Sequence, residues 1–406
     1  MVTNINVDSI DVRCASLFEK MEKKELQYND SLGWYDVDKW ASVEILDRLN
    51  ELAKEVKEHS EVLVVIGIGG SNQGARALID ALGNPSGVDI VWAGNTLSSF
   101  EYERVINEIG DRDFSINVIA KNFQTLEPGI AFRIFRALLK NKYGHEYNKR
   151  VYVTGTRESL LEKLCIENGW TWLDFPIDIG GRYSVLSPVG LFPIAVAGLD
   201  IYKFREGAKV ASNDITSNPT TLFKYASMRY ESFKNGYTME MLSFFEPRLF
   251  RFAKWWMQLM AESEGKDNKA LFPVMGSFSE DLHSIGQFIQ EGSKTIIETF
   301  IKIKDSNSKY PVSLIDVDDA FEYLDGKDMD QINKVSESAT IMAHSSRLPV
   351  NTIEIERLDE YNFGYLMMFF MKLCYLSGKL LDINPFDQNG VEEYKKWMFK
   401  GLGRNV

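Results

Sequence analysis

The most constraining feature of the sequence is a short apolar run that leads directly into a glycine-rich loop and then a helix. Residues 62–66 are aliphatic and mostly β-branched, which is typical of a parallel strand buried on both faces. Gly67, Gly69 and Gly70 follow, and a helical pattern begins soon after Gly74. This order points backbone N–H groups and a helix N-terminus at one place, so it predicts an anion site.

Two kinds of nucleotide site fit this loop poorly. A P-loop requires Lys-Ser or Lys-Thr after the second spaced glycine, but Ala75 and Arg76 follow Gly74. A dinucleotide fingerprint requires glycine at Asn72 and an acidic residue closing the next strand, where Gly94 stands. The remaining alternatives are a smaller anion, or glycines that only permit tight packing of strand and helix.

The same alternation continues along the first half of the chain. Apolar runs at 115–119 and 151–153 are each followed by a polar loop and a helical pattern, which predicts an α/β fold with a doubly wound parallel sheet. The loops that follow the strands then bring Ser71, Lys121 and Thr125 to one edge of the sheet. Hydroxyls, an ammonium and backbone amides suit a single phosphate group, although a solvated loop lysine remains an alternative for Lys121.

The chain of 406 residues is long enough for two packed domains. A polar stretch at 212–221 is interpreted as the connection to the second half, where we expect a strand near 238–242 and a helix from about 247 to 261. The predicted units are a helical arm and two α/β domains: 1–57, 58–211 and 212–406.

Composition excludes several classes of function. The formal net charge of −12 argues against nucleic acid and anionic membranes as main partners. The N-terminus has no signal-peptide pattern, and no stretch reaches the roughly 18 apolar residues of a membrane span, so we expect a soluble cytoplasmic protein. The three cysteines and four histidines show no metal-ligand spacing, which predicts reduced thiols and no metal site.

A second site-like segment lies near the middle of the chain. Gly180 and Gly181 permit a close backbone approach, and Arg182 offers a rigid, permanently charged fork to an oxyanion. Taken alone, the segment also fits a tight turn with a surface arginine.

Two side chains near the end of the predicted helix at 247–261 share one of its faces. Gln258 and Glu262 are four residues apart, and Gly265 suits the helix stop. A glutamate at a helix C-terminus opposes the helix dipole, which favours a functional role over a solvated acidic end.

The remaining candidates lie in the last third of the chain. His283 falls at a polar helix start, where it is either a proton carrier or a capped surface histidine. Gln388 and Lys395 are seven residues apart, two turns of a terminal helix, although lysines there are normally solvated.

Taken together, these segments resemble the glucose-6-phosphate isomerase family in its shorter bacterial form, over nearly the whole length from residue 62 to residue 399. The resemblance rests on three blocks that occur in the family's order: 178–184, 262–266 and 386–395. It implies two αβα sandwich domains of the sugar-isomerase type, a homodimer, and the interconversion of glucose 6-phosphate and fructose 6-phosphate without a cofactor.

The resemblance also implies residue roles. Glu262 matches the base that moves a proton between C2 and C1 through a cis-enediol, and Arg182 matches the cation beside the developing enediolate. His283 and Lys395 match the residues that open the sugar ring, with the histidine supplied by the other subunit. Polar contacts with the substrate are then expected from the backbone or side chains of Gly70, Ser71, Lys121, Asn122, Thr125, Gly181, Gln258 and Gln388.

The phosphate loop departs from the family's pattern. Family members usually have Ser-Lys-Thr or Ser-Lys-Ser followed by small hydroxyl residues, whereas Ala120 precedes Lys121 here and Asn122 follows it. Because hydroxyl donors to the phosphate are missing, two alternatives stay open. One is an isomerase for a different sugar phosphate, and the other is a regulatory protein that binds a sugar phosphate without turnover.

Overall fold

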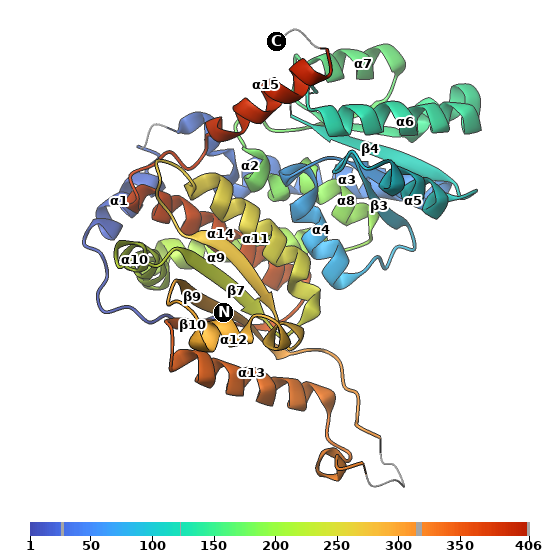
Figure 1. Cartoon of the computed structure of the whole chain (residues 1–406). Helices are drawn as coiled ribbons and strands as arrows, with labels where there is room; N and C mark the ends of the chain where they lie inside the picture. Colours follow the sequence, from blue (N-terminus) through green and yellow to red (C-terminus); the bar gives the residue numbers. More distant parts are fainter. Residues whose placement is uncertain (26–27, 122, 314–318, 404–406) are drawn as a thin grey trace.

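The computed structural model describes residues 1–25, 28–121, 123–313 and 319–403, and Figure 1 shows two α/β units packed against each other. The first unit is built on five strands that all run parallel, in the order β3-β2-β4-β5-β6. These strands are β2 Val62–Ile66, β3 Asp89–Ala93, β4 Phe114–Ala120, β5 Val151–Gly155 and β6 Thr171–Asp174. The helices around them are α3 Val43–His59, α4 Gly70–Leu82, α5 Ser99–Ile109, α6 Leu126–Tyr143, α7 Leu160–Asn168 and α8 Pro188–Val196.

The second unit has a five-stranded sheet in the order β1-β10-β9-β7-β8, parallel except for β1. Its strands are β1 Val2–Asn4, β7 Met239–Phe244, β8 Phe272–Ser277, β9 Ile296–Asp305 and β10 Val350–Arg357. Its helices are α9 Ile201–Ser217, α10 Thr220–Lys234, α11 Phe250–Glu264, α12 Gly286–Glu291, α13 Met329–Ser345 and α14 Glu360–Leu380. The predicted α/β class with mostly parallel sheets is confirmed.

Three further helices lie outside this alternation: α1 Arg13–Glu22, α2 Val37–Trp40 and α15 Glu392–Gly401. In Figure 1, the terminal helix α15 leaves the second unit and lies over the first unit, near α7. None of the described helices combines the length and the apolar character needed to cross a membrane. Cys14, Cys165 and Cys374 are buried free thiols.

The ends of the predicted units differ from expectation in two places. The helical arm contains a short strand, β1, in which Val2 pairs with Glu354 of β10 and covers the edge of the second sheet. The polar stretch predicted as a connection is mostly helical, because α9 continues to Ser217 and α10 begins at Thr220. The bounds 1–57, 58–211 and 212–406 therefore stay a prediction.

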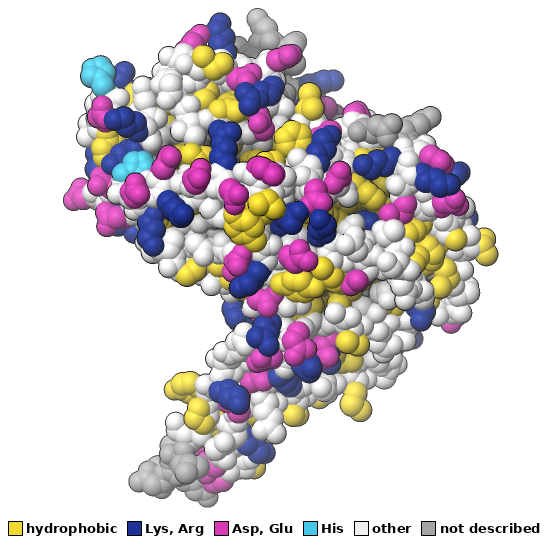
Figure 2. Space-filling view, turned by 180° about the vertical axis from the view of Figure 1, so that it is seen from behind, with side chains coloured by type: hydrophobic (Ala, Val, Ile, Leu, Met, Phe, Trp, Pro, Cys, Tyr) yellow, Lys and Arg dark blue, Asp and Glu magenta, His cyan; other side chains and the backbone are white. Residues whose placement is uncertain are grey.

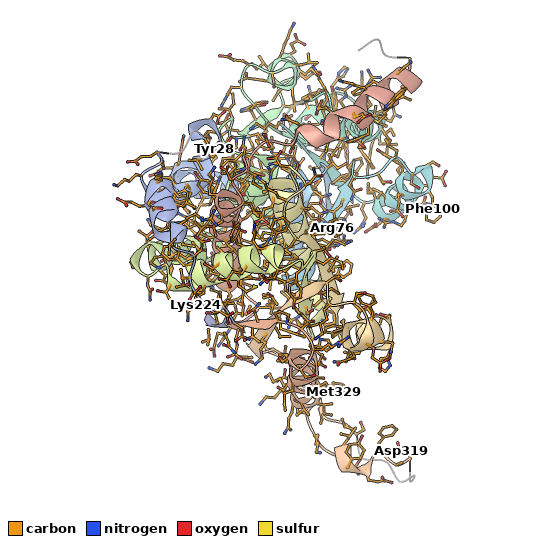
Figure 3. All side chains as sticks on the ribbon, turned by 60° about the vertical axis from the view of Figure 1, so that its left-hand side comes forward. Tyr28, Arg76, Phe100, Lys224, Asp319 and Met329 are labelled. Atoms are coloured by element: carbon orange, nitrogen blue, oxygen red, sulfur yellow. The ribbon has the colours of Figure 1, made fainter. Side chains whose placement is uncertain are left out.

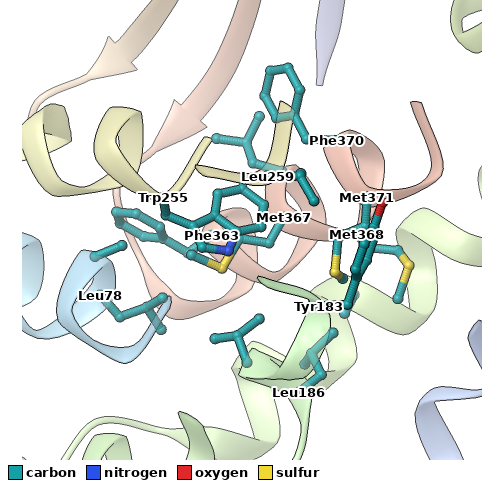
Figure 4. Packing of buried hydrophobic residues seen from close by; sticks show 14 of the residues in the cluster. Leu78, Tyr183, Leu186, Trp255, Leu259, Phe363, Met367, Met368, Phe370 and Met371 are labelled. Atoms are coloured by element: carbon teal, nitrogen blue, oxygen red, sulfur yellow. The ribbon is translucent and has the colours of Figure 1, made fainter. Parts of the chain in front are cut away.

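The largest hydrophobic cluster joins the two units. Figure 4 shows Trp255 and Leu259 of α11 packing with Met367 of α14, while Leu78 of α4 approaches from the first unit. Burial of this apolar area stabilises both the helices and their mutual orientation. In contrast to this apolar interior, the surface shown in Figure 2 carries basic and acidic side chains interspersed with one another.

Candidate active site

Arg182 is a buried cation at the junction of the two units. It lies in the short 3₁₀ helix Gly181–Leu186, and its side chain is only 2% exposed. Its Nε donates to the hydroxyl of Ser263 at 2.8 Å, and Nη2 donates to the carbonyl oxygens of Pro385 at 2.7 Å and Asp387 at 3.1 Å. Such a fixed set of acceptors fits a planar guanidinium and excludes the surface arginine considered above.

One guanidinium nitrogen faces the candidate base. Nη1 of Arg182 donates to Oε1 of Gln388 at 3.2 Å and lies 3.5 Å from Oε1 of Glu262. The other carboxylate oxygen of Glu262 accepts a hydrogen bond from Nε2 of Gln258 at 3.0 Å, so these two side chains share a face of α11 as predicted. The Glu262 side chain is 25% exposed, so the carboxylate remains accessible while its cationic partner is buried.

The glycine-rich loop that follows β2 packs directly against the loop that carries Arg182, called the arginine loop below. A Cβ at Gly70 would lie 1.9 Å from the carbonyl oxygen of Gly181, and Gly69 has a φ of 60°, so neither position accommodates a larger residue without a backbone shift. Helix α4 begins at Gly70, with Ser71 in its first turn. The glycines therefore permit close packing, one of the two readings left open, and the same packing puts a helix N-terminus beside Arg182.

Lys121 is not a solvated loop lysine. Its ammonium donates to the carbonyl oxygens of Ile177 and Ile179, both at 2.8 Å. Desolvation lowers the pKa of Lys121, and the nearby Asp178 carboxylate opposes that shift. The expected phosphate-loop cation thus joins the end of β4 to the loop that carries Arg182.

The N-terminal arm holds the same loop from the other side. The Asp178 carboxylate accepts hydrogen bonds from Lys39 Nζ at 2.5 Å and Trp40 Nε1 at 3.0 Å, and its backbone carbonyl accepts one from the Gly33 N–H at 2.9 Å. These contacts were not predicted, because nothing in the sequence beyond the presence of Asp178 in the block 178–184 points to them. The arm is therefore part of the framework of the site.

A buried ion cluster fixes the end of α11. Arg229 donates to Glu264 Oε2 at 2.5 Å and pairs with Glu240, and all three side chains are at most 3% exposed. The Glu264 carboxylate is therefore buried and paired with Arg229, whereas the Glu262 carboxylate is partly exposed to solvent. Of these two glutamates on α11, Glu262 is therefore the accessible one.

Comparison with known proteins shows the family to which the chain belongs. The family model for phosphoglucose isomerase matches residues 50–401. The chain belongs to the phosphoglucose isomerase family. It is 39% identical to a glucose-6-phosphate isomerase from Fusobacterium nucleatum, covering 99% of this chain and 93% of that protein. It is 43% identical to a glucose-6-phosphate isomerase from Bacillus cytotoxicus, covering 93% and 87% of the two chains.

A solved member of the phosphoglucose isomerase family has the same fold. The crystal structure of a glucose-6-phosphate isomerase from Chlamydia trachomatis matches with a TM-score of 0.77 at 20% identity, over 89% of this chain and 74% of that one. At this identity the match concerns the fold alone, and that fold has the α/β class with mostly parallel sheets that the sequence predicted.

Among the described contacts, none joins His283 or Lys395 to the Arg182–Glu262 pair of the same chain. His283 ends the 3₁₀ helix Glu280–His283 and is exposed. Lys395 of α15 pairs with Glu392 at 2.6 Å. Thr125 is the N-cap residue of α6, and Asn122 lies outside the described residues.

The described ranges also contain no group of three or more His, Cys, Asp or Glu side chains placed to share a metal ion.

Proposed function

We propose that this protein interconverts glucose 6-phosphate and fructose 6-phosphate through a cis-enediol intermediate. The observation that carries the proposal is the accessible Glu262 carboxylate held 3.5 Å from the buried Arg182 guanidinium. The carboxylate takes the proton from C2 of the aldose and returns it to C1. The guanidinium stabilises the oxyanion charge that develops between these two steps, which favours the transition state over the ground state.

The other predicted residues have supporting roles in this proposal. Gln258 donates a hydrogen bond to Glu262, and Gln388 accepts one from Arg182. In the proposal, both glutamines orient this pair and contact the sugar. The phosphate binds at the N-terminus of α4, with donors from the backbone of Gly70 and Gly181 and from the side chains Ser71, Lys121, Asn122 and Thr125. For Lys121 to bind phosphate, its ammonium exchanges at least one of its two carbonyl acceptors for a phosphate oxygen.

We also propose that the active form is a homodimer in which His283 and Lys395 open the sugar ring, with His283 reaching the site of the other subunit. His283 is exposed and makes no described contact with the Arg182–Glu262 pair of its own chain. The described part of the chain around Asp319, between β9 and α13, also lies far from the body of the molecule (Figure 3). This part exposes large apolar side chains: Tyr310, Phe321 and Tyr323, at 71%, 56% and 66%. Such a projection fits a surface buried by a second copy.

In this proposal the enzyme is cytoplasmic and serves glycolysis and gluconeogenesis. Purified protein is expected to convert fructose 6-phosphate to glucose 6-phosphate in an assay coupled to glucose-6-phosphate oxidation. A panel of other sugar phosphates, measured by turnover and by thermal shift, tests the altered phosphate loop. Binding without turnover of any member would replace the proposal with a regulatory binding protein, and a stronger preference for another member would assign a different substrate.

If His283 of one subunit completes the site that contains Glu262 of the other, two different inactive variants should complement each other in a heterodimer. Glu262→Gln and His283→Ala are each expected to lower kcat, but a heterodimer of the two variants contains one intact site. Co-expression with two different tags and isolation of the heterodimer should restore about half of the wild-type kcat. If His283 served its own subunit, both sites of the heterodimer would carry one lesion, and its activity would not exceed that of the less damaged parent.

A further inference from the structure

Lys266 is a partly buried cation that the proposed chemistry does not use. It follows the end of α11, and its side chain is 18% exposed. Its ammonium donates to the carbonyl oxygens of Ser263 at 2.9 Å and Asn384 at 2.5 Å, and it lies 2.8 Å from Oδ1 of Asp387. Lys266 therefore ties the helix that carries Glu262 to the segment 384–388.

The same short segment holds Arg182. Its carbonyl oxygens at Pro385 and Asp387 accept from the guanidinium, and the side chain of Gln388 accepts as well. Two cations thus bind one segment. Lys266 binds the carbonyl oxygen of Asn384 and the carboxylate of Asp387, while Arg182 binds the carbonyl oxygens of Pro385 and Asp387.

An aromatic cluster fixes the centre of this segment. The ring of Phe386 lies 5.4 Å from that of Tyr28, 5.4 Å from Tyr183 and 5.1 Å from Tyr375, measured between centroids. Since Phe386 is anchored independently, loss of Lys266 is not expected to unfold the segment. It leaves the Asp387 carboxylate with a neutral hydrogen bond, from Nδ2 of Asn384 to Oδ2 at 3.2 Å, in place of an ion pair.

The Asp387 carboxylate is a potential competitor of Glu262. The backbone carbonyl oxygen of Asp387 accepts from Nη2 of Arg182 at 3.1 Å, so the carboxylate belongs to a residue that already contacts the guanidinium. Carboxylates bind guanidinium groups more strongly than carbonyl oxygens do. Without the Lys266 ammonium, an ion pair between the Asp387 carboxylate and the Arg182 guanidinium becomes more favourable. Such a pair would turn Nη1 of Arg182 away from Glu262.

We propose that Lys266 is a positioning residue for Arg182, which it serves by holding the Asp387 carboxylate away from the guanidinium. This inference rests on the proposed isomerase function. Lys266 touches no reacting atom; it keeps Nη1 of Arg182 directed at Glu262 and at the oxyanion that forms there.

The test compares Lys266→Met, Asp387→Asn and the double variant in the full-length protein. Because the displaced arginine acts mainly in the transition state, K266M is expected to lower kcat by about 10- to 100-fold and to change KM by less than about threefold. Asp387→Asn alone lowers kcat by less than about fivefold, and in the double variant, which lacks the competing carboxylate, kcat recovers at least about fivefold relative to K266M.

Lys269→Met is the matched control, since the Lys269 ammonium lies on the same turn, 3.4 Å from the carbonyl oxygen of Asp382. A readout independent of turnover is the affinity for a sugar-phosphate hydroxamate that mimics the enediolate, compared with the affinity for inorganic phosphate. K266M should weaken hydroxamate binding by about tenfold and leave phosphate binding within about twofold, while K269M changes neither.

The outcomes separate this inference from the proposed function. A wild-type protein without turnover contradicts the isomerase assignment, whereas an active wild type with equal kcat in K266M and K269M overturns the role of Lys266. A double variant no more active than K266M also overturns it, because Lys266 would then act only as a structural tie. If K266M does not fold, the double variant decides alone. A kcat of at least about a fifth of wild type, the lower bound expected for Asp387→Asn, supports the inference, and any lower kcat overturns it.

Discussion

Replacing Glu262 with glutamine is expected to lower kcat for fructose 6-phosphate by about 10³-fold, with KM within about threefold of wild type, because a positioned general base contributes roughly 10²- to 10⁴-fold. Glutamine keeps the shape of the side chain and one oxygen that can accept a hydrogen bond from Arg182. In the native protein, Nη1 of Arg182 lies 3.5 Å from Oε1 of Glu262. It cannot take a proton from C2. The substrate therefore still binds, and the proton transfer fails.

The same variant has a second signature that steady-state rates do not provide. Proton transfer through an enediol exchanges the transferred hydrogen with deuterated solvent, so NMR of the sugar phosphate should show exchange with wild type and none with E262Q. Glu103→Gln, on the exposed side of α5, is the matched control and should behave as wild type. A kcat for E262Q above about a tenth of wild type would remove Glu262 from the role of base.

The parts of this site that could be predicted from sequence are local in the chain. Residues 62–66 and the glycines after them form a strand, a loop and a helix N-terminus because short-range sterics and hydrophobic pattern determine that order. Gln258 and Glu262 share a face because a spacing of four does so in any helix. Both interpretations needed only neighbouring residues.

The parts that were not predicted depend on contacts distant in sequence and on backbone acceptors. Arg182 donates to Pro385, 203 residues away, through a carbonyl group that every residue possesses. Lys121 likewise binds two carbonyl oxygens, so its side chain alone did not reveal that it joins two loops. The strand β1 is only three residues long, too short to show an alternating pattern.

The N-terminal arm illustrates how such contacts change an interpretation. Expected as a lead-in to the first domain, it stacks Trp34 on Tyr183 with centroids 4.8 Å apart, next to Arg182 in sequence. It also buries the Lys372 ammonium of α14 against Glu22 at 3.0 Å. The arm therefore supports the arginine loop and the central helix of the second unit together.

Arg182→Lys is expected to affect both activity and stability, because the native guanidinium serves four acceptors and a carboxylate at once. A lysine ammonium has three donors on a single atom and cannot reach Ser263, Pro385 and Asp387 while also facing Glu262. We expect kcat to fall by about 10²- to 10³-fold, the range for loss of one preorganised donor to a developing oxyanion. Buried acceptors left without a donor should lower the free energy of unfolding by about 2 kcal/mol.

Kinetics in the coupled assay and urea unfolding followed by circular dichroism measure the two effects separately. Arg104→Lys is the matched control: its guanidinium pairs with Glu101 at 2.9 Å and Glu108 at 2.7 Å on the exposed surface of α5. That variant should stay within about 0.5 kcal/mol of wild type and keep its kcat. If Arg182→Lys kept kcat within about threefold, a positive charge at this position would suffice, and the fixed orientation of the guanidinium toward Glu262 would not be what stabilises the enediolate.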